Sequence, residues 1–175
     1  MVGVTVLAVL VMTGCPAPED IVFFRDTGLE AAIRAELGQP LGLLSKADLL
    51  RLTKLDARSR GIRDLSGLEF ATELTQLDLD TNQVSNITAI GNLTKLEVLI
   101  LDSNEIFDLG PLQGLLEIRA LSLFDNQVAD IKALVANAEV PGGWGDRPGV
   151  QVILDINTLS DEALNVDVPR LRQLG

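Results

Sequence analysis

The residue types that most enzymes use for chemistry are scarce in this chain of 175 residues. It contains no histidine, no tyrosine and a single cysteine, Cys15. Ser-His-Asp catalysis, Cys-His catalysis and histidine-based metal sites are therefore excluded. No P-loop and no Gly-x-Gly-x-x-Gly motif is present. The 25 Asp and Glu residues remain, but no loop has the ligand spacing of a calcium site. We expect no enzymatic activity, no cofactor and no metal.

Cys15 directly follows an uncharged apolar segment. Val2 to Met12 is too short to span a bilayer, which needs about 20 residues, and has the length of a secretory signal. Met12-Thr13-Gly14-Cys15 resembles a bacterial lipobox, in which the thiol receives diacylglycerol. We expect a signal peptide over residues 1–14, lipidation of Cys15, a tether over residues 15–20, and export to the cell envelope. The alternative is a buried apolar strand or a disordered end, because no Lys or Arg lies near Met1.

Further along the chain, certain polar and apolar residues occupy equivalent positions 22 residues apart, for example Asp80 and Asp102. On neighbouring strands, such residues would form columns on one concave face. We expect eight of them to bind a ligand, namely Gln76, Asp78, Asp80, Val98, Ile100, Asp102, Ser122 and Phe124. Val98, Ile100 and Phe124 would form an apolar centre bordered by the three aspartates, as in a protein interface. In the competing interpretation, isolated exposed apolar residues are ordinary and the aspartates only keep the sheet soluble.

The element that must position these residues is a repeat. Leu96 to Ile106 reads Leu-x-x-Leu-x-Leu-x-x-Asn-x-Ile, the leucine-rich-repeat signature, and its first strand leucine recurs at equal intervals as Leu55, Leu77, Leu99 and Leu121. The Leu-x-Leu alternation predicts a short strand with both leucines pointing inward. In the return half of each repeat, after the asparagine, an apolar residue at every third position predicts 3₁₀ or extended structure. The sequence thus predicts an α/β leucine-rich-repeat solenoid with a parallel concave β-sheet and a 3₁₀ or extended convex side.

One asparagine per repeat falls where the chain leaves the strand. These residues are Asn82, Asn104, Asn126 and, after an insertion that delays the last repeat, Asn157. A side-chain amide both donates and accepts hydrogen bonds, so it can satisfy backbone groups of its own turn and of the neighbouring turn. We therefore expect a structural asparagine ladder along the solenoid.

The residues on either side of the repeats have a different periodicity. Asp26 is a plausible N-cap of a helix ending near Leu37, and Ser45 to Asp48 forms a capping box. We expect a helical N-terminal cap over residues 21–51, four repeats over 52–138, and an irregular last repeat with a C-terminal cap over 139–175. We predict helices from Ile131 to Ala138, where the repeat period breaks, from Ser160 onward, and with Pro169 in the first turn of a final helix.

Trp144 is the single tryptophan and lies among glycines in the inserted loop. Two interpretations are open for this side chain. It can anchor a partner, because tryptophan is enriched at interaction hot spots. Alternatively, it folds back and holds its own loop against the last repeat.

The repeat columns, the segment Phe24-x-Asp26-x-x-Leu29 before them and Asn157-Thr158-Leu159-Ser160 after them resemble bacterial leucine-rich-repeat proteins of the internalin-like type. The resemblance covers about residues 23–175. It implies a right-handed horseshoe arc with a parallel sheet on the concave side, in a secreted or surface-displayed protein. Members of this family bind many different proteins, so the resemblance does not specify the ligand.

The net charge of −11 narrows the range of partners. No basic face is available for phosphates, so we expect no nucleic-acid partner and no electrostatic attraction to anionic lipid. We expect a monomeric, non-enzymatic module that binds a protein or peptide and contacts the membrane only through the lipid on Cys15. The alternative is a structural spacer of the cell envelope without a dedicated ligand.

Overall fold

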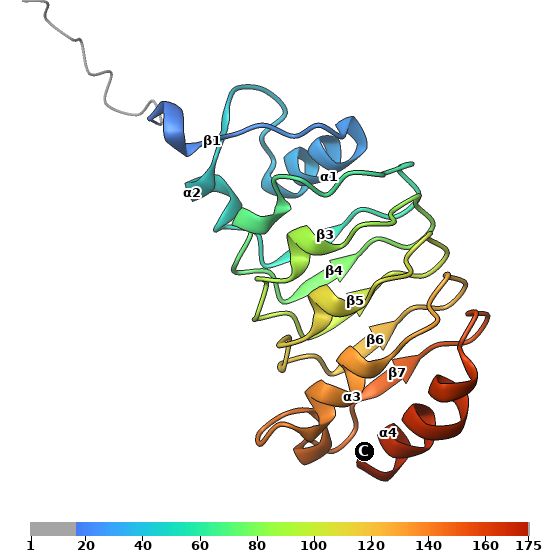
Figure 1. Cartoon of the computed structure of the whole chain (residues 1–175). Helices are drawn as coiled ribbons and strands as arrows, with labels where there is room; N and C mark the ends of the chain where they lie inside the picture. Colours follow the sequence, from blue (N-terminus) through green and yellow to red (C-terminus); the bar gives the residue numbers. More distant parts are fainter. Residues whose placement is uncertain (1–16, 175) are drawn as a thin grey trace, which may run out of the picture.

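The computed structural model describes residues 17–174, so the predicted signal peptide and Cys15 lie outside the described part. A five-stranded parallel sheet runs along the molecule with its strands stacked in chain order (Figure 1). Its strands are β3 (Lys54–Asp56), β4 (Gln76–Asp78), β5 (Val98–Ile100), β6 (Ala120–Ser122) and β7 (Gln151–Ile153). The predicted leucine-rich-repeat solenoid with a parallel sheet is confirmed.

The register of the sheet follows the repeat. Leu55 pairs with Leu77, Leu77 with Leu99 and Leu99 with Leu121, each exactly one repeat further along the chain. Leu121 then pairs with Val152, so the inserted residues loop out without shifting the register. Because side chains alternate along a strand, this register places the residues on both sides of each leucine in solvent-facing columns.

The return half of each regular repeat contains one turn of 3₁₀ helix. These turns are η2 (Leu68–Phe70), η3 (Thr88–Ile90) and η4 (Gly110–Leu112). Each contributes a buried residue that packs behind the strand leucines. Strand and turn are both too short to be stable alone, and the core between them is built from Leu, Ile and Val.

The N-terminal end carries two helices and a small second sheet. After the 3₁₀ turn η1 (Pro18–Asp20), β1 (Ile21–Val22) pairs antiparallel with β2 (Leu44–Ser45). Helix α1 (Thr27–Leu37) contacts β3, and α2 (Lys46–Leu49) begins with the predicted capping box at Ser45. In Figure 1, α1 lies beyond the first strand of the large sheet.

Asp26 joins α1 to the first repeat. Its Oδ1 caps the helix by accepting from the N–H groups of Gly28 and Leu29, at 2.9 and 3.1 Å. Its Oδ2 accepts from the N–H of Arg63 at 2.8 Å. One carboxylate therefore bonds to two segments of the chain, a role that its helix-capping pattern alone did not reveal.

The C-terminal end is also helical. The elements are α3 (Lys132–Glu139), the 3₁₀ turn η5 (Trp144–Asp146), a π-helical turn η6 (Ala163–Asp167) and α4 (Val168–Leu174). Pro169 lies in the first turn of α4, but the expected break before it is absent, because the helical segment continues from Asp161. The π-turn opens the hydrogen-bond ladder and so accommodates a proline that has no N–H.

Within residues 17–174, no helix combines the length and the hydropathy that crossing a bilayer requires.

Candidate functional site

The solvent-facing columns of the five-stranded sheet form one surface, here called the outer sheet face. The first column runs through Lys54, Gln76, Val98, Ala120 and Gln151, and the second through Asp56, Asp78, Ile100, Ser122 and Ile153. A third row follows the strands directly, with Arg58, Asp80, Asp102, Phe124 and Asp155. The register brings all eight predicted ligand-binding residues onto or beside this face.

The apolar part of the outer sheet face extends further toward β7 than the sequence predicted. Val98 and Ile100 are half-buried and Phe124 is exposed. Ile153 on β7 is 44% exposed, and Ile156 just beyond it is 66% exposed. β5 has a strand on each side, whereas β7 has only β6, and this difference explains the greater exposure at the edge. Ile153 and Ile156 were absent from the predicted site, because the repeat pattern aligns Ile153 with Ser122 but does not show how exposed an edge strand is.

Asp102 is engaged within the protein. Its Oδ1 accepts hydrogen bonds from the Ser122 hydroxyl and, at 2.9 Å, from the N–H of Phe124. The carboxylate thereby fixes the backbone that presents the Phe124 ring. The three predicted site residues Asp102, Ser122 and Phe124 thus form a connected group, in which Asp102 positions its neighbours.

The carboxylates near β3 and β4 surround one cation. Arg58 donates to Asp56 through Nε at 3.0 Å and Nη2 at 2.7 Å, and its Nε lies 3.5 Å from Asp78. The hydrogen bond from Arg58 lowers the pKa of Asp56, whereas burial raises the pKa of Asp78. This end of the outer sheet face is therefore internally charge-paired.

Asp80 lies outside this ion pair. Its Oδ1 accepts from the Thr81 hydroxyl at 2.9 Å. Among the described residues, Asp80 and Asp102 form no salt bridge with a Lys or Arg side chain. Gln76, next to Val98 in the register, is exposed. The middle of the face thus offers negative charge beside half-buried aliphatic side chains.

The four asparagines form a hydrogen-bonded column behind the strand ends. In the central member, Asn104, Oδ1 accepts from the N–H of Val84 at 2.9 Å. Its Nδ2 donates to the carbonyls of Leu79 at 2.9 Å and Leu101 at 3.1 Å. Asn82, Asn126 and Asn157 make equivalent bonds in their own repeats. These side chains hold consecutive repeats together and do not face a ligand.

A second ladder was missed in the sequence. Asp64, Asn86, Asp108 and Asp130 recur with the same period as the strand leucines, and each accepts a hydrogen bond from the N–H two residues further on. Asx residues at such a position stabilise a turn. Their common 22-residue spacing is a signal that the sequence alone contains. This ladder is structural and shapes the start of each return half.

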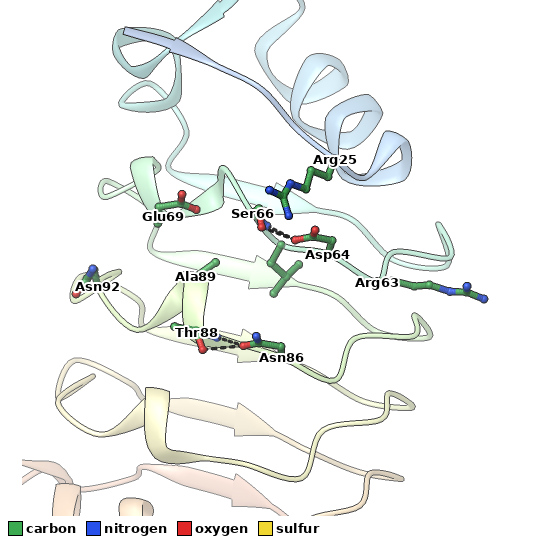
Figure 2. A pocket seen from close by; sticks show the side chains of 10 residues that line it. Arg25, Arg63, Asp64, Ser66, Glu69, Asn86, Thr88, Ala89 and Asn92 are labelled. Atoms are coloured by element: carbon green, nitrogen blue, oxygen red, sulfur yellow. Dashed lines mark hydrogen bonds between the residues drawn. The ribbon is translucent and has the colours of Figure 1, made fainter. Parts of the chain in front are cut away.

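Figure 2 shows an open groove of about 630 Å³ beside this second ladder. Its polar side chains are largely committed to their own turns. Asp64 accepts from the Ser66 hydroxyl, which lowers the pKa of Asp64, and Asn86 accepts from the Thr88 hydroxyl at 2.7 Å. The Arg63 side chain points away from the groove and donates to Gln83. Asp64 and Asn86 are thus occupied within their own turns, and Arg25, which also lines the groove, helps to lower the pKa of Asp64.

Trp144 is buried, and its Nε1 donates to the carbonyl of Leu115 at 3.0 Å. Arg147 in the same loop donates to both carboxylate oxygens of Glu117. The interpretation of Trp144 as an exposed partner anchor is therefore wrong. The indole fills the end of the core and holds the inserted loop against the preceding repeat.

The acidic side chains do not converge as a metal site would require. Across the part of the chain that the structure describes, no three His, Cys, Asp or Glu side chains come together in that way. The outer sheet face thus combines negative and aliphatic side chains.

The strand register, the asparagine column and the 3₁₀ return turns define a leucine-rich-repeat solenoid. The particular likenesses are to two proteins of Listeria monocytogenes. An internalin, InlF, has a TM-score of 0.70 at 29% identity, over 79% of this chain and 39% of that chain. The functional domain of InlJ, which includes a cysteine ladder, has a TM-score of 0.64 at 24% identity, over 78% of this chain and 28% of that chain.

This chain thus spans well under half the length of either neighbour. No protein-family model and no curated protein matches the chain.

Proposed function

We propose that this protein is a non-enzymatic module that binds a protein or peptide on its outer sheet face, which forms the concave side of a right-handed arc. The observation that carries the proposal is the meeting of apolar side chains at Val98, Ile100 and Phe124 with the Asp80 and Asp102 carboxylates, which no cation neutralises among the described residues. An apolar centre with a charged border is the usual composition of a protein interface. Five strands at a spacing of about 4.8 Å give a stack of roughly 20 Å, which suits a small interface.

We further propose that the protein is exported and held at the cell envelope by lipid on Cys15. The support is the sequence pattern of residues 1–15. In this arrangement, residues 21–51 form the N-terminal cap that covers the apolar end of the solenoid. Replacement of Cys15 by Ala should release the protein from the membrane fraction. Continued membrane attachment of Cys15→Ala would mean that the lipid anchor is wrong.

The binding proposal is tested by a pull-down from envelope or host extract with the wild-type chain and a triple variant. Asp80→Lys, Ile100→Glu and Asp102→Lys together reverse the charge and polarity of the proposed interface. We expect this variant to lose capture of the specific ligand by at least about tenfold, because hot-spot losses exceed about 1 kcal/mol each. Circular dichroism should show that its fold is retained.

A matched control carries changes of similar size on the return half of the repeats. It combines Glu105→Lys, Phe107→Gln and Gln127→Lys, all at exposed positions away from the strand columns. This control should capture the ligand as the wild type does. Equal capture by the site variant and the control would contradict the assignment of the outer sheet face as the ligand-binding surface.

The second candidate is a spacer domain without a dedicated ligand. It is favoured by the internal pairing of Asp56, Arg58 and Asp78, since charges satisfied within the protein are less available to a partner. A spacer should retain no specific protein in the same pull-down. The spacer function would be excluded by capture that the triple variant loses and the control retains.

A further inference from the structure

Near the N-terminal end of the molecule, three large apolar side chains outside the outer sheet face are exposed. Phe23 is 75% exposed, Leu41 is 82% exposed and Leu43 is 50% exposed. In the antiparallel pair of β1 and β2, Val22 lies opposite Leu44, and both are buried. Phe23 directly follows β1 and Leu43 directly precedes β2, so both side chains flank the buried pair of Val22 and Leu44, and both are exposed.

The loop that carries Leu41 is held in place. Arg34 on α1 donates from Nη1 to the carbonyl of Gln39 at 3.2 Å and from Nη2 to the carbonyl of Gly42 at 2.9 Å. The Gln39 side chain donates to the carbonyl of Leu43 at 3.2 Å. The three hydrogen bonds fix a short segment whose leucine points into solvent. A braced apolar side chain of this kind loses little conformational entropy on binding.

Charge is distributed very unevenly along the chain. Residues 1–64 contain eight acidic and eight basic side chains, whereas residues 65–175 contain seventeen acidic and six basic ones. The whole net charge of −11 therefore lies beyond residue 64. Residues 21–51, which carry the exposed apolar side chains, contain four acidic and four basic residues, and Glu19 and Asp20 precede them. An anionic lipid surface therefore repels this end far less than the rest of the solenoid.

The position of Cys15 limits how far this end can lie from a bilayer. Two residues of chain span at most about 7 Å, so Ala17 stays within that reach of Cys15. The following residues, Pro18–Asp20, form a compact 3₁₀ turn that leads directly into β1. A lipid on Cys15 thus keeps β1 and the exposed Phe23 that follows it close to the membrane surface.

We infer that Phe23, Leu41 and Leu43 form a membrane-seating surface that inserts into the interfacial region of the bilayer and stands the solenoid on its N-terminal end. The inference rests on the proposed lipid anchor for its biological setting. Apolar side chains gain free energy by leaving water for this region, and the lipid on Cys15 supplies the second attachment that stable membrane binding needs. Seated in this way, the molecule keeps its acidic C-terminal part away from the lipid surface.

The test measures the depth of single tryptophans in brominated phosphatidylcholine vesicles. Because Cys15 is the single thiol, the full chain can be coupled there to a maleimide-headgroup lipid, so the measurement does not depend on acylation in cells. Leu41→Trp should be quenched at least about fivefold more than Phe107→Trp, a matched exposed apolar position on the return half. The buried Trp144 supplies the same background in both variants.

A second pair of variants separates seating from mere nearness to the tether. When Phe23→Ser and Leu43→Ser are added to Leu41→Trp, the quenching should fall to the level of Phe107→Trp. Equal quenching of Leu41→Trp and Phe107→Trp, or quenching that the serine substitutions leave unchanged, would overturn the seating surface. A failure of the proposed lipid anchor would be seen separately, because the wild-type chain would then be absent from the membrane fraction of cells.

Discussion

The middle repeats and the last repeat contain the same strand and asparagine positions, but the side chains at these positions are more exposed in the last repeat. In the middle repeats each strand leucine is buried and each ladder asparagine has a repeat on both sides. In the last repeat, Val152 and Leu154 are only half-buried, and Asn157 is less buried than its three predecessors. The bonds of Asn157 remain, so the difference follows from the edge position of β7, which within residues 17–174 pairs with β6 alone.

The residues with positive φ at the strand ends show the same contrast between the middle repeats and the last repeat. Five residues at the strand ends have a positive φ near 50°, a conformation that side chains with a branched β-carbon rarely adopt. Four of them are polar, including the β-branched Thr81, and the last is an apolar isoleucine: Ser59, Thr81, Ser103, Asp125 and Ile156. The comparison teaches that the repeat pattern determines the interior, where neighbours enforce it, and becomes permissive at the open edge.

The largest expected effect is on core packing. Leu99→Ala in β5 removes a fully buried side chain that has strand leucines on both sides, so it should lower the free energy of unfolding by about 4 kcal/mol. Val152→Ala, the corresponding truncation in β7, should cost about 1 kcal/mol because its side chain is already half in solvent. Urea unfolding followed by circular dichroism measures both. Equal losses would abolish the contrast between interior and edge.

The asparagine ladder should show the same gradient in its hydrogen bonds. Asn104→Ala leaves the Val84 N–H and the Leu79 and Leu101 carbonyls without their partner, which should cost about 3 kcal/mol. Asn157→Ala should cost about 1 kcal/mol, since water can reach the groups it leaves. Hydrogen exchange provides the local measurement. In Asn104→Ala the amide of Val84 should lose protection, and retention of full protection there would contradict the ladder.

Replacement of Ile156 should stabilise the protein, in contrast to the substitutions above. Ile156→Asn relieves a branched side chain at positive φ and removes an exposed apolar group, so it should raise the free energy of unfolding by about 1 kcal/mol. The matched change Ser103→Asn in a middle repeat should alter stability by less than about 0.5 kcal/mol. A thermal melt compares the two. Destabilisation by Ile156→Asn would indicate that the isoleucine contributes packing that its exposure conceals.

The smallest expected effect lies at the opposite end of the solenoid and depends on pH. Burial tends to raise the pKa of Asp26, but hydrogen bonds from the N–H groups of Arg63, Leu29, Asp64 and Gly28 outweigh it, so the pKa is lowered. A lowered folded-state pKa adds stability that is present above the unfolded value near 3.8 and is lost as the pH falls toward the folded value. Asp26→Asn should therefore reduce stability at pH 7 and flatten its decline below about pH 4. Urea midpoints measured across this pH range provide the comparison, and a decline as steep as that of the wild type would show that other carboxylates dominate.

The sequence predicted the interior of this molecule better than its edge. The constant period assigns Leu77, Leu99 and Leu121 to one column because parallel strands in register make sequence spacing a direct measure of position. The same reasoning placed Val152 across the insertion. It did not predict the exposure of Ile153, since exposure depends on whether a further strand covers the edge.

Side-chain interactions across repeats were also beyond the pattern. The bond from the Ser122 hydroxyl to Asp102 and the two-part role of Asp26 depend on rotamers and on loop closure, which spacing alone leaves open. For Trp144, composition allowed both an anchor and a loop support. Only the position of the Leu115 carbonyl distinguished them.

The central claim, that the outer sheet face is the contact surface, is tested most directly by photo-crosslinking. A benzoylphenylalanine at Gln76, an exposed strand position next to Val98, is compared with one at the exposed Gln127 on the return half. With the protein that wild type captures, we predict a crosslink from position 76 and none from position 127. Crosslinking from position 127 alone, or equally from both positions, would contradict the assignment.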